Sequence, residues 1–465
     1  MPDPRPADAA QTKAEMLATR LAQAIENGMM APGARLRSIR ACADKEGLSR
    51  NTVIEAYNRL IARGYIEARI GSGYYVRKRA LPNAGLAPPH VVEAVDVVSL
   101  LREQLEQHYE VRVGDGRPPA SWTEETELGR HLRGARSAAL TNMKHGYGLP
   151  LGYQPLRETI ARLLHERSIQ VDADQILLTH GANHALDLIV RHLLQPGDVV
   201  LVDSPGYYPL FGKLKLAKVE MIGVPRAADG PDMDVLAQLA TAHRPKAFFT
   251  QSLAHNPTGG SISLPKSHRL LQLATQHDFL IIEDDPFADV MPATAPRPAA
   301  LDQLERVIYV SSFSKTLSAA LRVGYVAAAP RIMDALCDLK MVTLVATSDF
   351  VERVVHEMME TGQYRKHLAR LVGKLEQAHG PALRGLEDLG LDIFARGGLG
   401  YYLWCLLPHG TDELALTRKA SEAGIFLAPG SVFYPDRRST TPAMRVNVAY
   451  ASDPQFLQFL RKALG

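Results

Sequence analysis

Cysteine is scarce in this chain, and long apolar runs are missing. The 465 residues include three cysteines, Cys42, Cys337 and Cys405, which lie far apart and form no Cys-x-x-Cys pair. Such a set favours reduced, packed thiols and a cytoplasmic location over a disulfide framework. No uncharged apolar run reaches about 18 residues, so we expect no transmembrane helix. The N-terminal residues also lack the apolar core of a signal peptide.

An excess of one charge sign is nearly absent as well, because the net charge is only +3. The charge is unevenly spread, however. Residues 33–79 hold eleven Lys and Arg against four Asp and Glu, so this stretch carries +7 and the remainder −4. A basic segment on a mildly acidic chain predicts a polyanionic partner for that segment. A solvated surface with chance arginines would give the same balance, so the residue pattern must decide.

The length of the chain predicts two or three domains, since 465 residues exceed one compact core. An apolar fraction of 46% and a charged fraction of 22% are ordinary for globular protein. Several prolines between residues 79 and 119 indicate a linker with one amphipathic helix, roughly 90–110. The expected domains are residues 10–78, the linker 79–119, and residues 120–465 with a C-terminal subdomain from about 350.

The first domain has the periodicity of three helices followed by a β-hairpin. The expected elements are helices over residues 12–28, 38–46 and 50–63 and a hairpin over residues 64–76. Ser38 and Ser49 suit the N-caps of the second and third helices, and Gly47 breaks the chain between them. The third-helix side chains expected to face the core are Ile54, Tyr57, Leu60 and Ile61. This order of elements predicts a winged helix-turn-helix.

The rest of the chain alternates short apolar strands with helical stretches. Examples of the strands are residues 199–202, 279–282 and 307–310. Such alternation predicts an α/β fold with a mainly parallel sheet sandwiched by helices. A smaller α/β subdomain is expected at the C-terminal end.

Three motifs of the first domain resemble the GntR family of bacterial transcription regulators: Arg35-Leu36-Arg37-Ser38-Ile39-Arg40, Leu48-Ser49-Arg50-Asn51-Thr52-Val53 and Gly71-Ser72-Gly73-Tyr74-Tyr75-Val76. Arg37 stands where the family usually has proline. A recognition helix starting near Ser49 would enter the major groove of operator DNA, where Arg50 can pair with guanine or a phosphate. The residues expected to contact DNA are Arg37, Ser38, Arg40, Ser49, Arg50, Asn51, Thr52, Arg69, Gly71 and Gly73.

A second set of motifs lies in the larger domain: Ser311-Ser312-Phe313-Ser314-Lys315-Thr316, His255-Asn256-Pro257-Thr258-Gly259, and Asp284 after an apolar run. With these motifs the chain, from about residue 114 onward, resembles class I aminotransferases of fold-type I. A GntR head on such a body is the arrangement of the MocR subgroup of regulators. The resemblance implies that Lys315 binds pyridoxal 5′-phosphate (PLP) as a Schiff base, which requires a near-neutral amine.

The resemblance also implies the other contacts of PLP. Asp284 would pair with the pyridinium nitrogen, although its neighbours Glu283 and Asp285 are alternatives. Asn256 would bond the phenolic oxygen, and Tyr207 would stack on the ring. The phosphate would be bound at a helix start, where backbone amides suit a dianion. The residues expected there are Gly181, Ala182, Asn183, Ser312 and Arg322.

The resemblance assigns two further residues to binding partners other than PLP within the same chain: a second subunit and an effector. Tyr147, in Tyr147-Gly148-Leu149-Pro150, matches the tyrosine that reaches the phosphate of a partner subunit, which implies a domain-swapped homodimer with shared sites. Arg445 would bind the carboxylate of a substrate or effector through its fork of N–H donors. His180 and His184 have a spacing that metals can use, but no third ligand is apparent and we predict no metal.

One position departs from the aminotransferase pattern. Phe287 lies three residues after Asp284, where the family usually has a tyrosine. Phenylalanine donates no hydrogen bond to the phenolic oxygen, which would weaken catalysis but not PLP binding. The sequence therefore predicts a PLP-dependent transcription regulator that senses an amine, an amino acid or a B6 vitamer such as PLP itself. The alternative is an active aminotransferase with a regulatory head.

Overall fold

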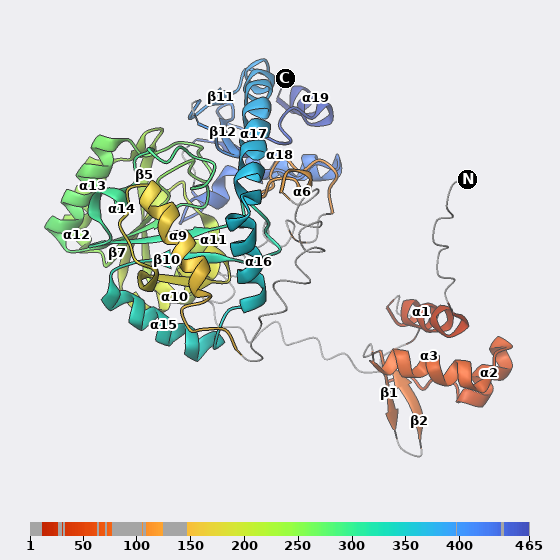
Figure 1. Cartoon of the computed structure of the whole chain (residues 1–465). Coiled ribbons are helices and arrows are strands. Elements are labelled where there is room, and N and C mark those ends of the chain that lie inside the picture. The colour runs from red at the N-terminus through yellow and green to blue at the C-terminus, as the bar shows by residue number, and fades with distance from the viewer. Residues whose placement is uncertain are drawn as a thin grey trace, which may run out of the picture. The chain divides into compact units, whose positions relative to one another are not determined.

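The computed structural model describes residues 12–26, 30, 33–62, 65–69, 72–76, 105, 108–123, 147–396, 398–438 and 441–464. The chain divides into two compact units, Met1–Ala87 and Pro88–Gly465, which we call the head and the body. Figure 1 shows the elements of both. None of the helices that the structure describes is long and apolar enough to cross a membrane.

The head is a winged helix-turn-helix, as predicted. Its elements are α1 (Lys13–Glu26), α2 (Ile39–Glu46), α3 (Arg50–Ala62), β1 (Ile66–Arg69) and β2 (Gly73–Val76). Ser38 caps α2 by accepting the N–H of Ala41, and Ser49 caps α3 by accepting the N–H of Thr52 at 3.1 Å. Gly47 ends α2 with a φ of +63°, a conformation that costs glycine little. Local capping chemistry thus sets the turn before the recognition helix.

The core of the head differs in detail from the prediction. The α3 side chains that are at most 1% exposed are Val53, Ala56, Tyr57 and Leu60. Their spacing of three and four residues places them on one helix face. The expectation for Ile54 and Ile61 was wrong, since they are 38% and 36% exposed. Ile54 and Ile61 each follow a buried residue, Val53 and Leu60, and so lie at the border of the buried face. They were predicted to be buried only because they are apolar.

The body contains an eight-stranded sheet of order β3-β10-β9-β8-β7-β4-β5-β6. The strands are β3 (Ile176–Thr179), β4 (Val199–Ser204), β5 (Glu220–Ala227), β6 (Gly230–Pro231), β7 (Ala247–Thr250), β8 (Leu280–Asp284), β9 (Val307–Ser312) and β10 (Gly324–Ala327). The five strands β9, β8, β7, β4 and β5 run parallel, and β10 and β6 are antiparallel to their neighbours. The prediction of a mainly parallel sheet is confirmed.

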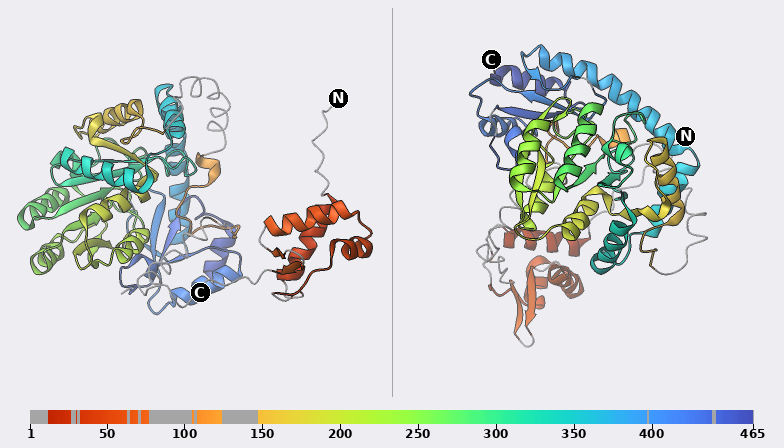
Figure 2. Two further views of the ribbon diagram at one scale, coloured as in Figure 1. Left: turned by 90° about the horizontal axis from the view of Figure 1, so that it is seen from below. Right: turned by 90° about the vertical axis from the view of Figure 1, so that its left-hand side faces the viewer.

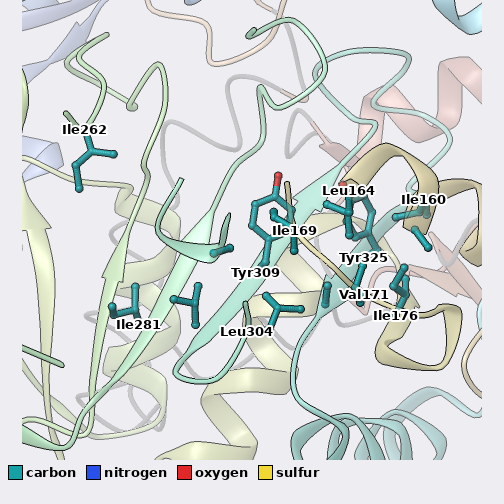
Figure 3. Close-up of a cluster of buried hydrophobic side chains, with 14 of the residues drawn as sticks. Ile160, Leu164, Ile169, Val171, Ile176, Ile262, Ile281, Leu304, Tyr309 and Tyr325 are labelled. Atoms are coloured by element: carbon teal, nitrogen blue, oxygen red, sulfur yellow. The ribbon is translucent and has the colours of Figure 1, made fainter. Parts of the chain in front are cut away.

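Helices cover both faces of this sheet (Figure 2). The first face carries α9 (Gln154–Glu166), α12 (Met233–His243), α13 (Leu264–His277), α14 (Pro298–Asp302) and α16 (Asp349–Glu360). The second carries α10 (Gly181–Leu193), α11 (Tyr208–Leu216) and α15 (Pro330–Leu344). Successive strand residues alternate between the two layers: Ile281 packs in the first and Ile282 in the second. Figure 3 shows part of the first layer, with Ile281, Tyr309 and Tyr325.

A smaller subdomain follows at the C-terminal end. Its antiparallel sheet has the order β11-β12-β14-β13. Its strands are β11 (Asp392–Ile393), β12 (Tyr402–Leu406), β13 (Ala428–Pro429) and β14 (Ala443–Asn447), and its helices are α18 (Glu413–Glu422) and α19 (Pro454–Leu464). The long helix α17 (Gln363–Glu387) joins the two parts: Tyr364 packs in the large core, and Leu371 and Leu386 pack in the small one.

The body begins earlier in the chain than predicted. Val111 and Val113 are buried in the core of the small subdomain, and the short helix α6 (Ala120–Thr123) follows. Residues 108–119 were assigned to the linker because of the prolines between residues 79 and 119, but these residues pack on the body. Most of the predicted linker helix, 90–110, lies outside the described residues.

The burial pattern of α3 predicts unequal effects for two adjacent residues. Leu60→Ala should destabilise the head by about 2–5 kcal/mol, because a buried side chain is lost and a cavity remains. Ile61→Ala, at a site that is 36% exposed, should cost about 1 kcal/mol or less. Hydrogen exchange of α1–α3 peptides in the full chain measures both. Equal losses would contradict the assignment of the buried face.

Candidate functional site

The predicted site residues gather at the carboxyl ends of the parallel strands of the body. Tyr207 follows β4, Asn256 follows β7, Asp284 ends β8 and Lys315 follows β9. Parallel strands end at the same edge of the sheet, so these residues are brought together although up to 108 positions separate them. Tyr207 and Asp284 line one pocket together with Gln251.

Asp284 is a buried carboxyl with one oxygen unpaired. Its Oδ2 accepts a hydrogen bond of 2.7 Å from Gln251 Nε2, while Oδ1 has no partner among the described residues. Burial raises the pKa of Asp284 to about 7, with a further contribution from Asp285, and the Gln251 bond opposes this rise. An unpaired buried oxygen of this kind fits a cationic N–H donor from a ligand. Glu283 and Asp285 each also keep one unpaired oxygen among the described residues, and their other oxygens accept from the Ala299 N–H and from Arg297. Neither lines the pocket of Tyr207 and Asp284.

Gln251 is a site residue that the sequence analysis missed. Besides bonding Asp284, it accepts the Asn256 N–H on Oε1 at 2.8 Å. Its own N–H donates to Asp203 Oδ2 at 3.1 Å, and Arg226 donates to both Asp203 and the Gln251 carbonyl at 2.9 Å. Gln251 therefore sets the relative position of Asp284 and Asn256. One signal in the sequence could have pointed to this network: Asp203 is an acidic residue in an apolar strand, as Asp284 is.

Arg445 is fully buried beside Asn256. It lies in β14, its Nη1 donates to Asn256 Oδ1 at 2.8 Å, and its Nη2 donates to the Gly114 carbonyl at 2.7 Å. Nε has no hydrogen-bond partner among the residues described, and the guanidinium lies over the rings of Tyr402 and Phe433. A buried cation with a free donor and no carboxylate partner suits an anionic ligand.

Lys315 is a half-buried amine with a lowered pKa. Burial lowers its pKa to about 8, Asp115 opposes this, and Arg445, Arg117 and Arg322 lower it further. A sizeable neutral fraction is therefore present near pH 8, as nucleophilic attack on a carbonyl requires. Its Nζ donates to the Gly116 carbonyl.

The expected phosphate residues surround the start of α10. Gly181 begins this 13-residue helix with a φ of +73°, and a Cβ there would lie 2.9 Å from Arg322 Nη2. Arg322 donates to the His180 carbonyl at 2.9 Å. Asn183 is exposed, Ala182 is half-buried and Ser312 is buried. A helix start with an adjacent exposed arginine has the charge and the amide donors that an anion needs.

Tyr147 is not brought to these residues within the chain that the structure describes. It is 87% exposed. The loop behind it is held by Lys340 of α15, which donates to the Pro150 carbonyl at 2.9 Å and to the Leu178 carbonyl at 2.8 Å. An exposed tyrosine on an anchored loop is available to a second molecule.

Phe287 and the two histidines have structural surroundings. Phe287 is 1% exposed and packs against the rings of Tyr401 and Tyr402 at centroid distances of 5.4 and 5.7 Å. His184 Nδ1 accepts the backbone N–H of His180 at 3.1 Å, so its ring caps the start of α10.

The head presents most of the predicted DNA contacts to solvent. The exposed ones are Arg37, Ser38, Arg40, Ser49, Arg50 and Asn51, and Thr52 is half-buried. Tyr57 of α3 donates to the Arg37 carbonyl at 2.9 Å, which fixes the loop before α2. Gly73 has a φ of +105° and lies against the guanidinium of exposed Arg35, a residue that the analysis did not select. Gly71 and the Arg69 side chain lie outside the described residues.

Comparisons with known proteins agree with this arrangement. Residues 13–76 match the family model of bacterial regulatory proteins of the gntR family, and residues 109–462 match that of aminotransferases of class I and II. The uncharacterized HTH-type transcriptional regulator YdcR of Escherichia coli is 31% identical over 431 residues, which cover 90% of this chain and 92% of YdcR.

Solved aminotransferases resemble the body. The kynurenine aminotransferase of Pyrococcus horikoshii has a TM-score of 0.71 and 26% identity and covers 80% of this chain and 95% of its own. The α-aminoadipate aminotransferase LysN of Thermus thermophilus, solved with N-(5′-phosphopyridoxyl)-L-leucine, has a TM-score of 0.70 and 26% identity over 80% and 96%.

The fold and the matches define a DNA-binding regulator with an aminotransferase-like domain. The chain belongs to the MocR subgroup of the GntR family of transcription regulators, with a body of the class I and II aminotransferase family.

The raised pKa of Asp284 predicts that the stability of the ligand-free protein depends on pH. The folded pKa of about 7 lies above the ordinary 3.8, so the folded state holds a proton that the unfolded chain releases. Stability is therefore lost as pH rises from about 4 through 7. Asp284→Asn should remove this loss and gain at most about 4 kcal/mol over wild type at pH 8.

Urea unfolding of the body between pH 5 and 8 measures this gain. Asp278→Asn is the control, because the side chain of Asp278 is 90% exposed. Its difference from wild type should stay flat over this range. A flat difference for Asp284→Asn would mean that the carboxyl is ionised throughout.

Proposed function

We propose that this protein is a transcription regulator whose body binds PLP through Lys315 and whose head binds operator DNA. The observation that carries the proposal is that two groups occur at the same edge of the sheet. One is Lys315, a lysine with a lowered pKa, and the other is Asp284, a buried carboxyl that keeps one oxygen unpaired. These are the two groups that a pyridinium aldehyde needs at opposite ends of its ring. In this proposal residues 10–78 are the DNA-binding domain.

The residues present fit PLP. Asp284 Oδ1 would accept the ring N–H, and Asn256 Nδ2 would donate to the phenolic oxygen while its Oδ1 stays on Arg445. Tyr207 would cover the ring, and the amides of Gly181, Ala182 and Asn183 with Ser312 and Arg322 would hold the phosphate. PLP supplies an aldehyde for an amine and an electron sink once bound. The phosphopyridoxyl ligand of LysN supports this assignment by similarity.

The effector in this proposal is an amine, an amino acid or a B6 vitamer. Arg445 favours a ligand with a carboxylate, because a guanidinium binds carboxylates through two parallel N–H bonds. Tyr147 would complete the phosphate site of a partner subunit, so the proposed regulator is a domain-swapped homodimer that reads two DNA half-sites. A regulator needs only different effector affinities in two states.

An active aminotransferase is the second candidate. The likeness to solved aminotransferases supports it. Phe287 weighs against it, because a buried phenyl ring offers the phenolic oxygen no hydrogen bond and leaves its stabilisation to Asn256. Turnover of an amino acid with a keto acid at rates typical of enzymes would favour this second candidate.

Lys315→Ala should abolish the visible absorbance of bound PLP and the stable adduct that borohydride leaves on the wild-type chain. The reason is that the amine of Lys315 forms the covalent bond. Absorbance spectra and peptide mass spectrometry measure both effects. Lys266→Ala, which changes a surface lysine paired with Asp229, should keep them. A borohydride adduct that persists in Lys315→Ala would refute the assignment.

Arg50→Ala should weaken DNA binding by about 1–3 kcal/mol without changing PLP absorbance, because one base or phosphate contact is lost. The probe is a DNA fragment selected from random sequence by the wild-type protein. Arg59→Ala serves as control, since Arg59 lies on the same helix but pairs with Glu15 and Glu55. Equal affinities of Arg50→Ala and Arg59→Ala in a binding titration would contradict the role of Arg50.

A further inference from the structure

Residues 111–114 run along the small subdomain, where Val111 forms a β-bridge with Ile425 and its carbonyl accepts the N–H of Phe426 at 2.8 Å. The N–H of Gly114 donates to the Phe426 carbonyl at 2.8 Å, and the N–H of Asn447 donates to the Val113 carbonyl at 2.7 Å. Val113 is fully buried. The chain is thus anchored to the body immediately before it reaches the site.

The residues that follow are held by side chains of the candidate site. Arg445 donates to the Gly114 carbonyl at 2.7 Å. Lys315 and the Tyr402 hydroxyl both donate to the Gly116 carbonyl, the latter at 2.8 Å. The proposed effector arginine and the proposed PLP lysine therefore touch the same short stretch of backbone.

The same stretch is tied from its other side. Asn447 Nδ2 donates to the carbonyls of Asp115 and Arg117 at 3.0 and 2.8 Å. The buried Asp115 carboxylate accepts from Arg112 at 2.8 Å and from the Arg117 N–H at 3.0 Å. A Cβ on Gly114 would lie 2.6 Å from the Ala428 nitrogen, so only glycine fits there. Residues 114–117 form one closely held turn, which we call the site turn.

We infer that the site turn is a wall of the effector site and that a ligand carboxylate is sensed through it. This inference rests on the proposed function. Both terminal nitrogens of Arg445 are already engaged, by Asn256 and Gly114. A carboxylate is a stronger acceptor than a carbonyl and binds through two nitrogens. Its oxygens therefore compete with the Gly114 carbonyl for Nη2, and the negative charge repels that carbonyl.

The inference also narrows the ligand class. An amine without a carboxylate leaves the Arg445–Gly114 bond in place, whereas an amino acid weakens it. The site turn lies at the body end of the segment that follows the head in the chain. A change at Gly114 therefore acts on the chain that leads back to the DNA-binding domain. In this inference the two ligand classes have different effects on the equilibrium between the states of the protein that differ in DNA affinity.

Two matched probes isolate the carboxylate: N-(5′-phosphopyridoxyl)-L-alanine and N-(5′-phosphopyridoxyl)ethylamine, which differ only in that group. Hydrogen exchange of residues 111–118 in the full chain should be several-fold faster with the alanine probe than with the ethylamine probe. Equal exchange, or slower exchange with the alanine probe, overturns the inference while PLP binding stands. Failure of both probes to bind overturns the proposed function as well.

Asn447→Ala tests the coupling to DNA. This change releases the site turn without touching Arg445 or Lys315, so exchange of residues 111–118 should be fast with either probe. The difference in DNA affinity between the two probes should then disappear. Gln455→Ala, which removes a bond to the Ala423 carbonyl elsewhere in the subdomain, should keep that difference. If Asn447→Ala kept the wild-type difference in DNA affinity between the two probes, the role of the site turn would be refuted.

Discussion

The arrangement of the candidate site depends on one buried carboxylate, that of Asp203. Burial opposes its ionisation, but Arg226 and His255 outweigh this and lower its pKa. The ionised group accepts from Arg226, Thr250 and the Gln251 N–H, at 2.9 to 3.1 Å. Gln251 is thereby fixed, and it in turn places Asp284 and Asn256. This buried ion pair, in which Arg226 Nε has no hydrogen-bond partner among the described residues, thus fixes the positions of Gln251, Asp284 and Asn256.

The candidate site itself also holds polar atoms that are unpaired among the described residues. Asp284 Oδ1 and Arg445 Nε are buried polar atoms without partners in the described part of the chain. Such atoms cost stability unless a ligand pairs with them. The two apolar layers of the large sheet supply the stability that tolerates them. Local inconsistency of this kind is expected at functional sites rather than in the core.

Most of the fold could be predicted from the sequence, because helices, strands and caps are indicated by residues that are close together in the chain. Helical periodicity and the serine caps predicted the head, and the alternation of apolar strands with helices predicted the mainly parallel sheet. The resemblance to class I aminotransferases pointed to Lys315, Asp284 and Asn256, which the structure places at one edge of the sheet. Gln251 was missed because its role arises from the pairing of β4, β7 and β8, across separations of 33 and 48 residues. Residues 108–119 were misassigned because the prolines of this region are typical of a linker, whereas the buried side chains of Val111 and Val113 belong to the body.

The early start of the body constrains how such a gene could be shuffled. Residues 111–118, which include the site turn, belong to the body, although they lie within the predicted linker, residues 79–119. A recombination breakpoint upstream of codon 108 exchanges the head and leaves the pocket whole. A breakpoint a few codons later would remove residues that Arg445 and Asn447 hold in the body.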